Sequence, residues 1–231
     1  MQSFVRQSIQ RLIPPIPEAV RDEFAILSAT RLQSQSRALF LAMFLTLPFV
    51  LYASSVGAEP WIRYGMPLAM GSFCLIGFIS LIKDRNASAS PDLARQFIGE
   101  ATFFSATICV LVSIWCVLSY VNAPDDMKLF YPFTLAMGSL TTIYTLATIR
   151  LAAILNIIIG IVPITLILLL SGDPLAWSAA ASLIMVTTFL YRLITQQNDQ
   201  FIHMLILQHD MSELAHTDPL TGLFNRRILA E

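Results

Sequence analysis

Long apolar runs without a charged residue are the feature that most constrains this chain. Between residues 38 and 193, charged residues fall almost entirely in the short stretches that separate one apolar run from the next. Each run is close to the roughly 20 residues that a helix needs to cross about 30 Å of hydrocarbon. A single strand cannot cross lipid, because its backbone groups would lack hydrogen-bond partners there. The runs therefore predict transmembrane helices.

Six runs have this length, so we expect an all-α membrane protein with a six-helix bundle over residues 37–193. The composition agrees, since 56% of the residues are hydrophobic and only 13% are charged, against about 25% charged in a soluble domain. Prolines at positions 48, 67 and 163 are expected to distort their spans. The expected spans are 38–56, 62–82, 102–120, 129–148, 151–170 and 175–193.

The lysines and arginines predict the orientation of these helices. With the N-terminus in the cytoplasm, twelve of the fourteen basic residues lie on the cytoplasmic side, and only Arg63 and Lys128 lie outside. This distribution obeys the positive-inside rule for an even number of spans. We therefore expect a multi-pass protein with both termini in the cytoplasm.

Residues 1–36 form a predicted cytoplasmic segment. Val20, Phe24 and Leu27 recur there at helical spacing among charged residues, a pattern typical of an amphipathic helix. Two interpretations remain open. The segment lies along the membrane surface, or it extends the first span into the cytoplasm.

Residues 194–215 predict a signalling helix that leaves the sixth span. Two sets of positions on it alternate spacings of four and three, as in a parallel coiled coil. Polar residues interrupt both seams, so we expect a weak homodimer in which a signal favours one seam over the other; a monomeric linker is the alternative. The first seam contains Leu193, Met204, Leu207, Met211 and Leu214. The second contains Ile194, Asn198, Phe201 and Leu205.

Residues 216–231 contain the string D-P-L-T-G-L-F-N-R-R, from Asp218 to Arg227. Asp218 before Pro219 is typical of a helix N-terminus. The string resembles D-x-L-T-G-L-x-N-R-R, the pattern at which the catalytic domain of the GGDEF family of diguanylate cyclases begins. The matching positions are Asp218, Leu220, Thr221, Gly222, Leu223, Asn225, Arg226 and Arg227.

This resemblance implies a bacterial inner-membrane protein with an α/β cyclase domain beginning at about residue 216. Enzymes of this family condense two GTP into cyclic di-GMP with Mg2+, and two cyclase domains must face each other. The family's metal-binding and guanine-contacting residues lie downstream of the motif. We therefore expect no catalytic residue, metal ligand or cofactor within this chain. Alternatives are a receptor or scaffold with a degenerate GGDEF domain, and a small transporter.

The predicted outer loops are short, so a signal would have to be read within the bundle or from the bilayer. A hydrophobic small molecule, the bilayer itself or a partner membrane protein remain open as the signal. Asn156 is expected to bond across helices at a close contact; a polar ligand site with Thr141 and Tyr144 is the alternative. The spans hold no histidine, which disfavours intramembrane haem or copper. A net charge of −1 gives no indication of nucleic-acid binding.

Overall fold

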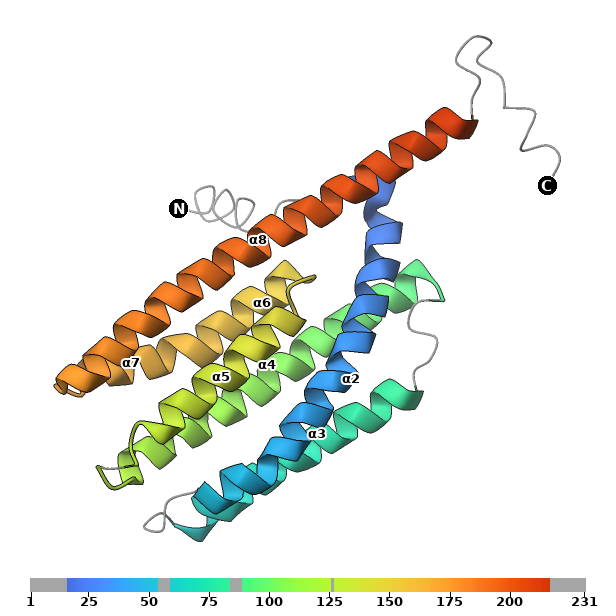
Figure 1. The fold of residues 1–231 in the computed structure, drawn as a ribbon. Coiled ribbons are helices and arrows are strands. Elements are labelled where there is room, and N and C mark those ends of the chain that lie inside the picture. Colours follow the sequence, from blue (N-terminus) through green and yellow to red (C-terminus); the bar gives the residue numbers. More distant parts are fainter. Residues whose placement is uncertain (1–15, 54–58, 84–88, 126, 217–231) are drawn as a thin grey trace, which may run out of the picture.

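The computed structural model describes residues 16–53, 59–83, 89–125 and 127–216. Within these ranges the chain is almost entirely helical and contains no strand, which confirms the predicted all-α class. Figure 1 shows the helices running back and forth between the two ends of a bundle. The elements are η1 (Glu18–Val20), α2 (Arg21–Ala53), η2 (Trp61–Gly65), α3 (Met66–Lys83), α4 (Pro91–Asn122), α5 (Phe130–Thr145), α6 (Arg150–Asn156), η3 (Ile157–Ile161), α7 (Val162–Leu170) and α8 (Pro174–His216).

Five helical stretches of the described residues are long and apolar enough to cross a membrane. They correspond to the first, second, third, fifth and sixth predicted spans. The fourth, α5, has 16 residues, or about 24 Å of helix, because it ends at Thr145 in a turn that precedes Arg150. The five stretches are Glu18–Tyr52, Trp61–Ile82, Pro91–Asn122, Arg150–Leu170 and Pro174–Ser212.

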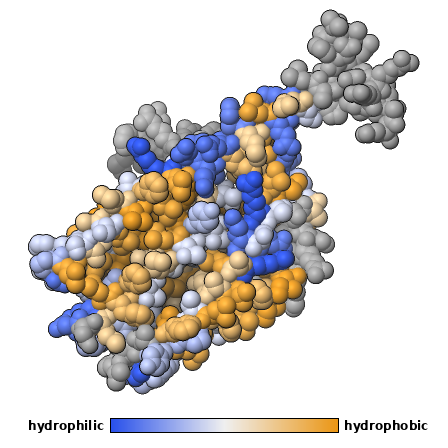
Figure 2. Space-filling view, viewed as in Figure 1, coloured by the Kyte–Doolittle hydropathy of each residue, from blue (hydrophilic) through white to orange (hydrophobic). Residues whose placement is uncertain are grey.

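The outer surface of the bundle is apolar. Phe103, Leu170 and Met185 are 76%, 83% and 76% exposed. Figure 2 shows apolar residues over most of the visible face of the bundle, with hydrophilic residues gathered at its ends. Large apolar side chains that face outward in this number indicate a protein whose surroundings are lipid.

Helix α4 lies at the centre of the bundle, against α2, α3, α5, α6 and α7. Its Trp115 is 1% exposed and meets Tyr131 of α5, which is fully buried, edge to face with ring centroids 5.6 Å apart. Aromatic pairs favour this geometry. The pair fixes how α4 and α5 pack.

Two turns of π-helix, η2 and η3, come just before Pro67 and Pro163. A proline has no N–H, so a carbonyl in the preceding turn loses its usual partner. Side chains of α4 supply the missing donors: the Trp115 indole donates to the Ile62 carbonyl at 3.1 Å, and the Ser113 hydroxyl donates to the Ile159 carbonyl at 2.9 Å. The expected distortion at these prolines thus takes the form of π turns, whereas Pro48 lies inside the continuous helix α2.

Helix α2 runs unbroken from Arg21 to Ala53. Of the apolar residues predicted at helical spacing near the N-terminus, Phe24 and Leu27 therefore belong to the same helix as the first span, and Val20 lies in η1 directly before it. The first turns of α2 pack against the C-terminal half of α8, as Figure 1 shows. One helix thus connects the interior of the bundle to the helix that leaves it.

Candidate functional site

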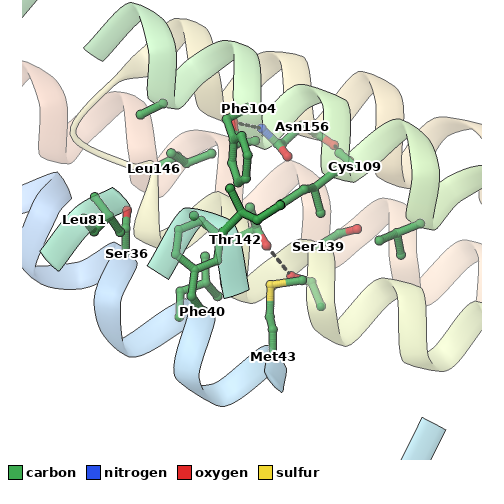
Figure 3. A pocket seen from close by; sticks show the side chains of 18 of the residues that line it. Ser36, Phe40, Met43, Leu81, Phe104, Cys109, Ser139, Thr142, Leu146 and Asn156 are labelled. Carbon is green, nitrogen blue, oxygen red and sulfur yellow. Dashed lines mark hydrogen bonds between the residues drawn. The ribbon is translucent and has the colours of Figure 1, made fainter. Parts of the chain in front are cut away.

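A cavity of about 240 Å³ lies between α2, α3, α4, α5 and the end of α6. Figure 3 shows side chains from these helices around it, among them Phe40, Phe104, Thr142 and Asn156. Most of the lining is apolar, and Glu100 is the only charged residue among the described residues that line it. The other polar side chains in the lining are Ser36, Ser80, Ser105, Ser139, Thr142 and Asn156.

Asn156 is 1% exposed and uses only one end of its side-chain amide. Its Nδ2 donates to the Ala152 carbonyl at 2.9 Å and to Ser105 Oγ of α4 at 3.3 Å, so it bonds across helices. Its Oδ1 is buried with no hydrogen-bond partner among the described residues. A buried acceptor without a partner costs about 1–3 kcal/mol, so such a group in a native structure requires an explanation, for example an unseen water or ion.

Ser105, Cys109 and Ser113 lie one helical turn apart on α4 and face the π-helical turn. Besides the hydroxyl contacts already described, the Cys109 thiol lies 3.8 Å from the Asn156 carbonyl oxygen. A Cβ added to Gly160 would lie 2.7 Å from Ser139 Oγ and 3.0 Å from Cys109 Sγ. The backbone of η3 therefore packs tightly against α4 and α5, and this side of the cavity has a close-packed wall.

Of the three residues predicted as a polar sensor site, only Asn156 reaches the cavity. Thr141 is exposed, and its hydroxyl donates to the Met137 carbonyl of its own helix at 2.8 Å. Tyr144 is 56% exposed and lines a separate groove. The face of α5 that lines the cavity carries Leu135, Gly138, Ser139 and Thr142, and Leu146 continues this face just after the helix ends. These residues are related by spacings of three or four, which places them on one face of a helix. The prediction instead selected Thr141 and Tyr144 for their polar side chains, and so it missed this face.

The groove that contains Tyr144 lies between α2, the end of α5 and α8. Arg31, Thr148, Asn198 and Phe201 also line it. This groove is more polar than the cavity, and it lies where α8 passes the ends of the other helices.

An apolar cluster joins η1 and the N-terminal part of α2 to α8. Its buried members are Val20, Phe24, Phe201 and Leu205, which we call the α2–α8 cluster. The rings of Phe24 and Phe201 lie 5.5 Å apart, and the guanidinium of Arg31 lies over the Phe201 ring. Contacts of a cation with an aromatic face are attractive, so the cluster holds the two helices together beyond the bundle.

A second set of contacts ties α8 to the junction between α5 and α6. The Asn198 side-chain amide donates to the Thr148 carbonyl at 3.0 Å. Arg150, 9% exposed, pairs with Asp199 at 3.4 Å. Helix α8 is therefore held at two levels, by this polar junction and by the α2–α8 cluster.

The two predicted seams of α8 have different environments. Ile194, Asn198, Phe201 and Leu205 of the second seam are buried against helices of the same chain. In the first seam, Leu193 is half-buried and three residues are more open. Met204, Leu207 and Met211 are 46%, 51% and 71% exposed, while nothing is described of the Leu214 side chain. The sequence presents the seams as competing; the second is already occupied within the chain.

The motif from Asp218 to Arg227 lies outside the described residues. No group of three or more His, Cys, Asp or Glu residues is close enough to hold a metal ion in the part of the chain that the structure describes. No protein-family model, curated protein or solved structure matches this chain.

Proposed function

We propose that this chain is a membrane sensor and transmission module that controls a C-terminal diguanylate cyclase making cyclic di-GMP from two GTP. The observation that supports it most is α8, a single helix from Pro174 to His216 that ends two residues before Asp218. Its 43 residues extend about 65 Å, roughly twice the thickness of the hydrocarbon layer. The identity of the output domain rests on the resemblance of Asp218 to Arg227 to the GGDEF-family motif.

We place the chain in the bacterial inner membrane with six crossings, in which α5 joins the five longer stretches. Helix α5 lies beside α4 and α6 and runs between the same two ends of the bundle (Figure 1). A short span is accommodated by local thinning of the bilayer. Arg31, Arg95 and Arg150 lie toward the end at which α2 begins and α8 leaves, and the positive-inside rule assigns that end to the cytoplasm.

Self-association along the first seam fits this function. Met204, Leu207 and Met211 form an exposed apolar stripe on the part of α8 beyond the sixth predicted span. A parallel dimer would remove this stripe from water and would bring together the two cyclase domains, each of which holds one GTP with Mg2+. A signal would act by favouring one of two packings of α8, and only if it bound one state better than the other.

Cysteine trapping in the full-length protein tests the proposal. We expect Met204→Cys to form a disulfide between two copies, with a yield that changes between conditions of high and low cyclic di-GMP production. Leu205→Cys, which is fully buried in the α2–α8 cluster, should react far less. His203→Cys, exposed but on neither seam, is the matched control.

Two outcomes would contradict the proposal. One is equal trapping at all three positions in both conditions. The other is production of cyclic di-GMP that stays unchanged, in amount and in response, when residues 1–193 are deleted.

A further inference from the structure

We infer that the cavity beside Asn156 is a binding site for an uncharged amphiphile, a small molecule with an apolar body and one hydroxyl or N–H group. This inference deepens the proposed function by naming the chemical class of the signal. Only the consequence of binding rests on the proposed function; the binding itself does not.

The size and lining of the cavity define the apolar part of the ligand. A dry cavity of about 150 Å³ lined by Leu, Ile and Phe takes benzene, so a cavity of about 240 Å³ has room for a larger molecule. Phe40, Met43, Phe97, Phe104 and Leu135 supply apolar walls from three helices. A saturated chain or a small ring system matches these walls.

Asn156 Oδ1 defines the polar part of the ligand. It is a buried acceptor without a partner, and the hydroxyls of Ser105 and Thr142 are already engaged. Ser105 donates to the Thr102 carbonyl at 3.0 Å, and Thr142 donates to the Gly138 carbonyl at 2.8 Å. A hydroxyl or N–H brought by the ligand would satisfy the orphan oxygen, and a molecule without such a donor would leave it unpaired.

The one charge in the described lining of the cavity is negative, which disfavours an anionic head group. Glu100 is the only charged residue in the described lining, and its carboxylate accepts a hydrogen bond from Gln96 Nε2 at 2.8 Å. A fatty-acid carboxylate would meet a like charge there and no lysine or arginine of the described lining. The matching ligand is therefore an alcohol or an amide rather than an acid.

The cavity opens toward the apolar surface of the bundle. Ile76 of α3 is 59% exposed and Gly138 of α5 is also exposed, and both line the cavity. An apolar molecule dissolved in the bilayer can enter by this side without crossing the polar ends of the bundle.

Helix α2 gives occupancy of the cavity a route to α8. Ser36, Phe40 and Met43 of α2 line the cavity, and Phe24 of the same unbroken helix lies in the α2–α8 cluster. A ligand that moves α2 relative to α4 and α5 therefore also moves the residues that hold Phe201 and Leu205. Under the proposed function, this is how the ligand would change the output.

Photolabelling of the purified chain in lipid nanodiscs tests the site directly. The probe is decanol with a diazirine in its chain, and the competitors are decanol, its methyl ether and decanoic acid. We expect labelled peptides from the cavity walls of α2, α4 and α5. Decanol should compete about tenfold better than its methyl ether, as expected for one hydrogen bond to a buried acceptor, and the acid should compete least.

Two glycine variants separate the cavity from the rest of the surface. A Cβ at Gly138 meets nothing within 4 Å, so Gly138→Leu should fill part of the cavity without a clash and lower the labelling severalfold. Gly99→Leu is the matched control, because Gly99 is a helical glycine that is equally open and lies outside the cavity lining. Equal labelling of the two variants would contradict the assignment of this cavity as the binding site.

Asn156→Leu tests the hydrogen bond separately. This change removes the acceptor at similar volume, so the preference for decanol over its methyl ether should disappear while some labelling persists. Equal competition by the alcohol and the ether in the unchanged chain would overturn the assigned ligand class, and that comparison does not depend on the folding of any variant.

The binding and the proposed function can fail separately. Absent labelling with normal control of the cyclase would reject this site alone. Labelling of the cavity, together with cyclic di-GMP production that never responds to decanol or to Gly138→Leu in the full-length protein, would reject the sensor function and leave the binding site in place.

Discussion

The guanidinium of Arg31 lies over the ring of Phe201, with its central carbon 4.3 Å from the ring centroid. The two residues belong to the first and last long helices of the described chain, and Phe24 packs against the same ring. This contact joins a helix that lines the cavity to the helix that leads out of the bundle. The strength of the α2–α8 cluster should therefore control which face of α8 is available to a partner.

Phe24→Ala should open the α2–α8 cluster. Truncating a buried phenylalanine costs about 3 kcal/mol or more, and Phe24 is 9% exposed. We expect disulfide trapping between copies at Leu205→Cys to rise severalfold in this background, while trapping at Met204→Cys changes little. Phe103→Ala, at a ring that is 76% exposed, is the control, and a rise in trapping at position 205 there as well would argue against the cluster as the cause.

Asp199→Asn should destabilise the junction of α8 with α6 only modestly. Asp199 has a 59% exposed side chain, so solvent screens the pair and the expected cost is about 1 kcal/mol, less at high salt. Arg150→Ala should cost more, because it also removes the packing of a side chain that is 9% exposed. Thermal unfolding of both variants at low and high salt measures this; a larger effect for Asp199→Asn would contradict the prediction.

Ser113→Ala should remove the donor to the Ile159 carbonyl before Pro163 and cost about 1 kcal/mol of stability. The loss should be smaller in a Pro163→Ala background, because alanine restores a backbone N–H to the turn. A double-mutant cycle on thermal stability measures the difference. Thr165→Ala is the control, since that hydroxyl donates to the Ile161 carbonyl of its own helix segment. Equal costs of Ser113→Ala in both backgrounds would disprove the link with Pro163.

Two glycines inserted after Leu207 should uncouple the segment that follows α8 from the state of the helix bundle. Glycine costs about 1 kcal/mol in a helix interior, and two extra residues rotate everything beyond them by about 200°. Under the proposed function, we expect cyclic di-GMP production by the full-length protein to lose its response to conditions. Insertion of one helical heptad keeps the seam in register and should preserve the response; loss of the response in both variants would point to damage other than rotation.

Most of the helices could be predicted because apolar runs of spanning length have few alternatives in lipid. The ends of the helices were less predictable. The third span was expected to begin at residue 102, but α4 begins at Pro91, after Ser90 accepts a hydrogen bond from the Leu93 N–H. The fourth was expected to reach residue 148, but α5 ends at Thr145. Apolar length does not encode where a helix continues into water or where a turn interrupts it.

The site could be predicted only in part. Asn156 was identifiable because an amide cannot be satisfied as easily as a threonine hydroxyl within its own helix, and it does bond to Ser105 of α4. Its companions were not identifiable, because the face that α5 turns toward the cavity depends on how α5 packs against α4. Likewise, the partner of Phe201 is Phe24, and no local pattern around either residue reveals that pairing.

The unbroken course of α2 from the wall of the cavity to the α2–α8 cluster has a reciprocal consequence. If a molecule in the cavity alters how α8 pairs, then thermodynamic linkage requires pairing of α8 to alter the affinity of the cavity by the same factor. Under the proposed function, GTP binding to the cyclase domains, or merely a higher protein concentration in the membrane, would then tune how strongly the bundle holds its ligand.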